Sequence, residues 1–136
     1  MNISNLALQI ETLAHALDAY ERKILGSGEL GKLSPAQIDC LARIYKMETP
    51  TVSELAREMR ITKPSVTATV ERLEKAGLLE KEQSAEDRRV QRLILTKKGL
   101  KLASDHKAVH YKFVRDYFKN LEAPDISRLC ELLEKA

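Results

Sequence analysis

The residues with the clearest chemistry are an aspartate followed by two arginines, Asp87, Arg88 and Arg89. They lie in a polar segment between two short strand-like runs, which predicts the tip of a β-hairpin. A guanidinium group at such a tip suits the narrow minor groove of A·T-rich DNA, whose negative potential attracts it. We expect the Asp87 carboxylate to pair with Arg89 and fix the loop. Arg89 is then the first candidate for the groove contact and Arg88 the second, the alternative being a surface hairpin whose ion pair contributes little.

A second group of polar residues precedes the hairpin, near the start of a helix that Thr62 is expected to cap. Ser65, Thr67 and Ala68 are small enough to approach base edges in the major groove, and Ala68 could contact a thymine methyl group. Phosphate contacts position a protein without reading sequence. The candidates for them are Thr51, Lys63, Arg72 and Lys75. Taken alone, this helix could also be an ordinary amphipathic helix with a polar outer face.

Two histidines, His106 and His110, are four residues apart on another predicted helix. This spacing lets two imidazoles share a metal ion such as zinc. Two ligands do not complete a site, and the candidates for the others are Asp39, Glu21 and His15. The alternative is a pair of histidines packed near a cleft and bonded to backbone or solvent. We expect that no cofactor is required, and that zinc, if it binds, acts as an effector.

The elements that must position these residues are mainly helices. Apolar residues alternately three and four apart follow residues 3–24, a heptad-like pattern that predicts a long helix. An apolar side of this length on a terminal helix needs a partner, and a second subunit is favoured over packing within the chain. A helix with Ser34 as N-cap is expected to run to about residue 47. Thr51 and Glu54 form a capping box for the next helix.

The hairpin and the later helices follow from glycine, threonine and proline positions. Gly77 is expected to end the helix that Thr62 caps. Strands are predicted over residues 78–82 and 90–95. Thr96 is expected to cap a long helix running to about residue 120, and Pro124 lies near the start of a last helix. Cys130 falls on the apolar stripe of that last helix and is expected in the core.

Composition limits the class of protein. The chain has 136 residues, enough for one compact domain, and its 32% charged and 4% aromatic residues favour helices over a β-sandwich. The net charge is only +3, yet residues 88–101 hold six basic residues and no acidic one, as suits a phosphate-contacting patch. Without a signal peptide or an apolar membrane span, we expect a cytoplasmic protein with no membrane partner. Two cysteines are too few for a disulfide framework.

These elements predict a mainly α fold with a small β-wing, namely a winged helix-turn-helix core flanked by N- and C-terminal helices. Several segments resemble the MarR family of winged-helix regulators, and the most specific is the Asp-x-Arg wing with the Leu-Thr that follows it. The segments are Leu-Ser-Pro-Ala-Gln at 33–37, Val-Ser-Glu-Leu-Ala at 52–56, Lys-Pro-Ser-Val-Thr at 63–67, Val-Glu-Arg-Leu-Glu-Lys-Ala-Gly-Leu at 70–78, Asp-Arg-Arg at 87–89 and Leu-Ile-Leu-Thr at 93–96. Ala68 departs from the family, whose members often carry a larger polar residue there.

The resemblance implies a homodimer that binds a pseudo-palindromic DNA operator, often as a repressor. It divides a single domain, residues 1–136, into a DNA-binding part at 34–100 and dimerisation helices at 1–33 and 101–136. The alternatives are a winged-helix module that binds protein rather than DNA, and an enzyme that uses the histidine pair. We expect no enzyme, because no nucleophile–base constellation or glycine-rich phosphate loop is visible.

The resemblance also implies an effector site between the dimerisation and DNA-binding parts. Family members that bind fatty acyl groups or phenolic acids suggest that an apolar anion enters a cleft. The residues expected to line it are Ile38, Tyr45, Val109, His110 and Phe113. Zinc-sensing members place a histidine pair in the long helix, although Lys23 and Ile38 stand where those sensors tend to carry ligands. Redox sensing through Cys40 is a weaker possibility, because the family's oxidation sensors usually carry their cysteine in the first helix.

Overall fold

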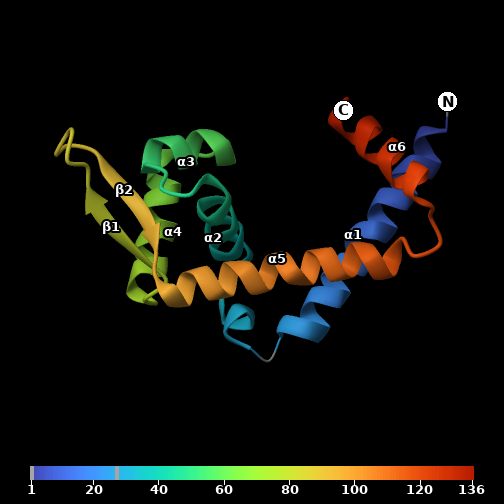
Figure 1. The fold of residues 1–136 in the computed structure, drawn as a ribbon, viewed down its shortest axis with the longest axis horizontal. Helices are drawn as coiled ribbons and strands as arrows, with labels where there is room; N and C mark the ends of the chain where they lie inside the picture. Colours follow the sequence, from blue (N-terminus) through green and yellow to red (C-terminus); the bar gives the residue numbers. More distant parts are fainter. Residues whose placement is uncertain (1, 27) are drawn as a thin grey trace.

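The computed structural model describes residues 2–26 and 28–136. In this part of the chain the elements are α1 (Ile3–Leu25), the 3-10 turn η1 (Glu29–Lys32), α2 (Pro35–Met47), α3 (Val52–Met59), α4 (Lys63–Lys75), β1 (Leu79–Gln83), β2 (Gln91–Leu95), α5 (Lys97–Tyr117) and α6 (Ala123–Glu134). The molecule is elongated, with the β1–β2 hairpin at one end, both termini at the other and α5 running between them (Figure 1). The predicted mainly α fold with a small β-wing is confirmed.

Two capping boxes start the helices that lead into the wing. The backbone N–H of Gln37 donates to the Ser34 hydroxyl over 3.2 Å, and the Ser34 N–H donates to the Gln37 side chain over 2.8 Å. At α3 the Glu54 N–H donates to the Thr51 hydroxyl over 3.1 Å, and the Thr51 N–H donates to the Glu54 carboxylate over 3.4 Å. Each box satisfies backbone N–H groups that a helix start leaves unpaired. Both predicted helix starts are therefore confirmed.

The end of α4 is built around Gly77, whose φ of 75° is left-handed and suits glycine. The N–H groups of Gly77 and Leu78 donate to the carbonyls of Glu74 and Leu73, each over 3.0 Å. This pair of bonds is a Schellman motif, which ends a helix and redirects the chain. The predicted helix end at Gly77 is confirmed.

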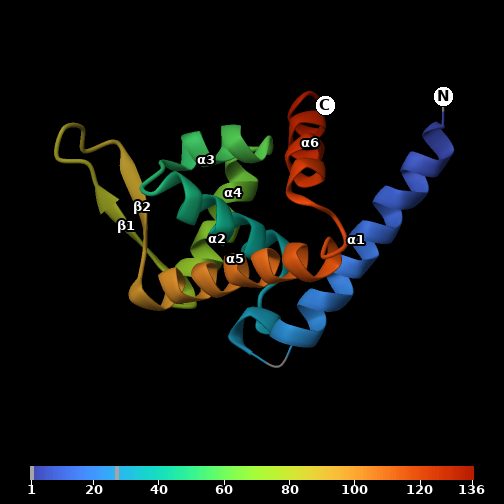
Figure 2. The ribbon, with the colours of Figure 1, turned by 45° about the vertical axis from the view of Figure 1, so that its right-hand side comes forward.

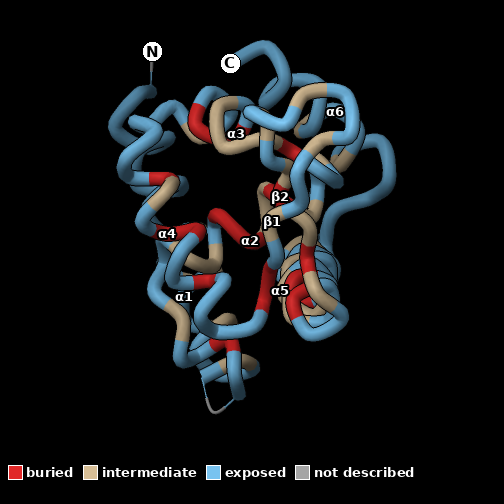
Figure 3. Tube along the Cα trace, turned by 90° about the vertical axis from the view of Figure 1, so that its left-hand side faces the viewer, coloured by how far each residue is buried: buried red, intermediate tan, exposed pale blue. Residues whose placement is uncertain are grey.

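The buried core lies between α2, α3, α4, the wing strands and the first half of α5. Its fully buried side chains include Leu41, Ile44, Leu55, Val66, Val70, Leu73, Leu78, Leu79 and Leu93. Figure 3 shows how burial is distributed along the chain. In contrast, α1 and α6 contain no buried residue. The core therefore lies in the central part of the chain, while the terminal helices keep most of their surface exposed.

Several details differ from the sequence-based expectations, among them the start of β2 at Gln91 rather than at residue 90. The strand β1 begins at Leu79, because the Leu78 N–H completes the cap of α4. The turn η1 was not predicted. The helix α5 ends at Tyr117 rather than near residue 120. Cys130 is exposed, so its assignment to the core was wrong, because α6 has no neighbour within the chain that covers it.

The wing is a two-stranded antiparallel hairpin. Its register pairs Leu79 with Leu95 at the base and Gln83 with Gln91 toward the tip. The buried Leu79 and Leu93 attach its inner face to the core. No helix in the described residues has the length and apolar character needed to cross a membrane.

Candidate nucleic-acid interface

The helix α4 presents the predicted base-contacting residues on its outer side. Val66, Val70 and Leu73 are fully buried against the core. Thr69 is buried beside them, and because a helix repeats about every 3.6 residues, the opposite side of α4 faces outward. Ser65 and Ala68 are exposed and Thr67 is half-buried. All three lie in the first two turns of α4, as entry of the helix N-terminus into a groove requires.

The start of α4 is fixed by a local hydrogen-bond network. The Thr62 hydroxyl accepts from the Ser65 N–H over 3.4 Å and donates to the Ser65 hydroxyl over 2.9 Å. Pro64 lies in the first turn, where its missing N–H costs nothing. Ser65 is therefore held in position while its own hydroxyl proton can still be donated to a ligand.

The predicted phosphate-contacting residues fall into two groups. Lys63, Arg72 and Lys75 are exposed on α4. Thr51 is half-buried, and its hydroxyl oxygen already accepts the cap bond of α3. The three exposed cations can therefore contact the phosphate backbone of DNA, whereas the hydroxyl of Thr51 already caps α3.

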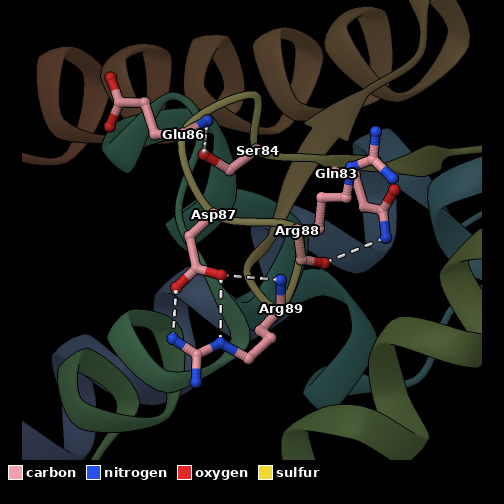
Figure 4. Close-up of polar contacts among 6 residues, drawn as sticks. All are labelled: Gln83, Ser84, Glu86, Asp87, Arg88 and Arg89. Carbon is pink, nitrogen blue, oxygen red and sulfur yellow. Dashed lines mark hydrogen bonds and ion pairs between the residues drawn. The ribbon is translucent and has the colours of Figure 1, made fainter.

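The wing tip places Asp87 and Arg89 as predicted. The Arg89 backbone N–H and Nε donate to Asp87 Oδ1 over 3.0 and 3.2 Å, and Nη2 donates to Oδ2 over 3.3 Å (Figure 4). The Arg89 side chain remains 91% exposed. Hydrogen bonds from the Arg89 side chain and backbone hold the pKa of Asp87 below its ordinary value of 3.8. The carboxylate therefore stays ionised and orients the guanidinium without covering it.

Backbone and side-chain bonds close the rest of the tip. The Gln83 amide donates to the Arg88 carbonyl over 3.0 Å, and the Glu86 N–H donates to the Ser84 hydroxyl over 3.3 Å. Between the strands, the Ser84 N–H donates to the Val90 carbonyl over 2.9 Å. The side chains of Arg88 and Arg89 leave this closed loop in different directions (Figure 4). The tip is a preformed loop that can offer one arginine to a groove and another to a flanking phosphate.

The tip-side half of β2, at Arg92 and Leu93, is attached to the residues before α3. The Leu93 N–H donates to the Pro50 carbonyl over 2.8 Å, and Thr51 and Arg92 form an isolated antiparallel bridge. Arg92 Nη1 also lies 3.1 Å from the Thr49 carbonyl oxygen and 3.6 Å from Glu54 Oε1. Sequence reasoning treated Arg92 only as one charge of a basic run. Thr49 and Arg92 are 43 residues apart, so no local pattern in the sequence indicates this attachment.

A cleft of about 1110 Å³ is lined by residues of α1, α2, α5 and the segment around η1. Figure 2 shows how these elements are arranged. Of the predicted lining residues, Ile38, Tyr45 and His110 are present. Val109 and Phe113 do not line the cleft, so this part of the prediction was wrong. Both are buried, and the Phe113 ring packs edge-on against Tyr20 of α1 with centroids 5.5 Å apart.

Glu21, His106 and His110 form a compact cluster at the α1–α5 crossing. One ligand atom from each lies within 4.8 Å of the others. Glu21 Oε1 bonds to His110 Nε2 and lies 3.6 Å from His106 Nε2. Burial and the neighbouring His110 lower the pKa of His106, so burial favours the neutral form that binds metals.

The predicted ligand Asp39 is not in this cluster. It lines the same cleft but pairs with Arg43 over 3.3 Å. Among the described residues, Glu21 is the candidate that joins the histidines, and His15 does not. The Asp39 prediction failed because sequence spacing cannot say which helix crosses α5 at the level of the histidines.

Cys40 is fully buried in α2. Burial and the neighbouring Asp39 raise its pKa to about 12. Since the thiolate is the reactive form of cysteine, this side chain is unreactive near neutral pH. The geometry gives no support to redox sensing through Cys40.

Comparisons with known proteins agree with this geometry. Residues 33–90 match the model of the MarR family. The Streptococcus pneumoniae protein FabT, solved in complex with DNA, superposes with a TM-score of 0.86 at 24% identity, over 98% of this chain and 94% of that one. YusO from Bacillus subtilis gives 0.71 at 25% identity, over 98% and 92%. The reduced form of MarR from E. coli gives 0.70 at 24% identity, over 96% and 94%.

Proposed function

We propose that this chain, whose residues 33–90 match the model of the MarR family, is a sequence-specific DNA-binding transcriptional regulator. The observation that carries the proposal is the exposed Arg89, held by Asp87 at the tip of a wing attached beside α3. In this function Ser65, Thr67 and Ala68 face the major groove. Lys63, Arg72 and Lys75 meet phosphates, and the wing arginines enter the minor groove. The resemblance to FabT, which was solved bound to DNA, supports the same assignment.

The protein acts as a homodimer on a pseudo-palindromic operator. In the single chain, α1 and the C-terminal helices leave large apolar side chains open to solvent. They include Ile3, Leu6, Ile10, Val114, Tyr117, Leu121, Leu132 and Leu133. Many exposed large apolar side chains on neighbouring helices are typical of protein–protein interfaces. A two-fold axis through these helices would place two wings on half-sites about one helical turn apart.

Selection of bound sequences from a random duplex pool tests this function, followed by binding to DNA upstream of the protein's own gene. We expect a palindromic consensus whose affinity falls steeply as salt rises, because each neutralised phosphate releases counterions. A winged-helix module that binds protein would instead select no consensus and show no salt-sensitive affinity. That result would refute the proposal.

The cleft between α1, α2 and α5 supports control by a small effector. We also propose that the protein acts as a repressor. Apolar walls including Ile38 and Tyr45 suit an apolar or aromatic acid or a fatty acyl group. Lys46 and Lys107 line the same cleft and can pair with a carboxylate. Adding an aromatic acid or a fatty acyl ligand to the preformed operator complex should change its dissociation constant. The variant Tyr45→Ala should blunt that response without changing operator affinity in the absence of ligand.

A divalent metal such as zinc is the second candidate effector, and the cluster of Glu21, His106 and His110 favours it. Two imidazoles and a carboxylate are a donor set that zinc accepts, with a fourth position left for water or another ligand. Cobalt titration should produce a visible absorption band that Glu21→Ala and His106→Ala abolish. Asp39→Ala should leave that band unchanged. The metal hypothesis ends if the purified protein holds no zinc and gives no band with cobalt.

A further inference from the structure

We propose that Arg92 is a positioning residue that sets the angle between the wing and α3, and thereby decides which half-sites α4 and the wing tip can contact together. This inference rests on the proposed DNA-binding function and adds a determinant of its specificity. Arg92 belongs to the same basic run as the tip arginines. Arg89 bonds to Asp87 within the tip, whereas Arg92 contacts Thr49 and Glu54, which are distant in the sequence.

The contacts of Arg92 join three features of the DNA-binding part. Its backbone bridges Thr51, the N-cap of α3. Its guanidinium donates to the Thr49 carbonyl over 3.1 Å and faces Glu54 Oε1 at 3.6 Å. The other oxygen of Glu54 accepts from the Thr51 N–H in the capping box of α3. One carboxylate thus serves the helix start with one oxygen and the wing with the other.

A second attachment lies at the next residue along β2. The Leu93 N–H donates to the Pro50 carbonyl over 2.8 Å, and the Leu93 side chain is fully buried. A single hydrogen bond fixes the distance between two segments but leaves rotation about it possible. The Arg92 guanidinium holds the wing at a second point, so the two adjacent contacts together restrain the twist of the hairpin against α3.

The consequence for DNA binding follows from the shape of the hairpin. The wing extends beyond this attachment to the tip at Asp87–Arg89, so a small rotation of the hairpin at Arg92 and Leu93 displaces Arg89. The side chains of a binding site must be held within about 0.5 Å of the positions in which they contact the ligand. Loss of the Arg92 contacts should therefore let the wing tip move relative to α4. The protein should then discriminate less sharply between bases at the positions near the wing.

Two variants test this in the full-length protein. Arg92→Gln removes the guanidinium, and Glu54→Gln removes the facing charge but keeps a side chain that caps a helix. Lys97→Gln is the matched control, because it removes one exposed positive charge from the same run. For each we would measure affinity for the selected operator, the dependence of affinity on salt, and the penalty for single base changes at wing-proximal and α4-proximal positions.

We expect Arg92→Gln to weaken operator binding on the order of tenfold, the scale of one charge-assisted hydrogen bond. The wing-proximal penalties should shrink, while the α4-proximal penalties and the salt slope stay as in the wild type. Glu54→Gln should act in the same direction, and the double variant should be no worse than Arg92→Gln alone. Lys97→Gln should leave the base penalties unchanged.

The proposal is overturned if Arg92→Gln lowers the slope of log affinity against log salt concentration by about 0.9, the value for one lost phosphate contact, both with glutamate and with glutamine at position 54. It is also overturned if base discrimination does not change. A readout without DNA separates this from failure of the proposed function. In the free protein, Arg92→Gln should speed hydrogen exchange of the Leu93 amide, with unchanged circular dichroism, and Lys97→Gln should not. Unchanged exchange would contradict the proposal even if no duplex is bound.

Discussion

Among single side chains, Asp87 in the wing tip has the least obvious place on a surface that we propose to bind DNA. Asp87 accepts three hydrogen bonds from Arg89, and these bonds hold its pKa below 3.8. A lowered pKa in the folded loop means that the ionised carboxylate stabilises the loop at pH values above the unfolded pKa. That contribution disappears only as the pH falls through the lowered value. Near neutral pH the pair is therefore intact.

The variant Asp87→Asn tests what this pair does for recognition. Asparagine can still accept from the Arg89 N–H but loses the charge that orients the guanidinium. We expect the ratio of operator affinity to random-duplex affinity to fall, because non-specific binding gains from the loss of a negative charge while the wing contact loosens. Fluorescence anisotropy with both duplexes measures the ratio. An unchanged or increased ratio would show that Asp87 does not shape the contact.

Cys40 gives a prediction about reactivity. Its thiol is fully buried and its pKa is raised to about 12, so almost no thiolate is present at mildly alkaline pH. We expect iodoacetamide to leave Cys40 unmodified in the folded protein and to modify it in denaturant. Peptide mass spectrometry distinguishes the two. Rapid alkylation of Cys40 in the folded protein would mean that α2 opens readily and would reopen the possibility of redox sensing.

Among secondary-structure elements, the sequence predicted best what depends on near neighbours. The capping boxes at Ser34 and Thr51 and the helix end at Gly77 depend on residues within four positions, and all three were predicted. The turn η1 was missed because its glycine-rich surroundings carry no periodic pattern. The attachment of Arg92 to Thr49 spans 43 residues, so no local pattern announces it.

The cleft and the cluster of Glu21, His106 and His110 also depend on contacts between distant segments, which the sequence did not predict. The stripe on α5 placed His106, His110 and Phe113 on one broad face, which the structure bears out. It could not say that α1 crosses at the histidines, bringing Glu21 rather than Asp39 to them. Nor could it say that Phe113 packs against Tyr20 outside the cleft. Which helix covers which part of a stripe is a tertiary property.

The junction of β2 and α5 supplies a test of packing. Gly99 lies in the first turn of α5, where a Cβ would lie 1.9 Å from the Leu78 carbonyl oxygen. Helix propensity favours alanine there by about 1 kcal/mol. We expect overpacking to win, so that Gly99→Ala lowers the free energy of unfolding by about 1–3 kcal/mol in chemical denaturation.

Gly28→Ala is the control for that substitution, because its Cβ would lie 3.6 Å from the nearest atom, an ordinary contact. It should change stability by no more than about 0.5 kcal/mol. If Gly99→Ala were as stable as the wild type, the close approach of α5 to the end of α4 would be wrong.

Across the whole molecule, the rigid core and the DNA-binding residues lie toward one end, and the exposed apolar helices toward the other (Figure 1). This arrangement predicts that dimerisation depends on α1. Leu6 is 60% exposed in the single chain. Introducing a charge there with Leu6→Glu should shift the protein from dimer toward monomer in size-exclusion chromatography with light scattering.

His15→Glu is the matched control for the dimer, because it adds an acidic residue on α1 at a position outside the heptad-like pattern of apolar residues. It should remain dimeric. A Leu6→Glu protein that stays fully dimeric would move the interface elsewhere, and a monomeric wild type would remove the two-fold arrangement altogether.

The affinity of the Arg89→Ala variant for the selected operator is the most direct measurement of how this protein functions. Arg89 is exposed, and within the part of the chain that the structure describes it bonds only inside the tip, so its removal should leave the fold and the dimer intact. We predict binding at least about tenfold weaker than wild type, within the range measured for residues that dominate an interface. Lys119→Ala, at the opposite end of α5, should bind as the wild type does. If Arg89→Ala bound the operator as tightly as the wild type, the wing would not be a DNA-reading element.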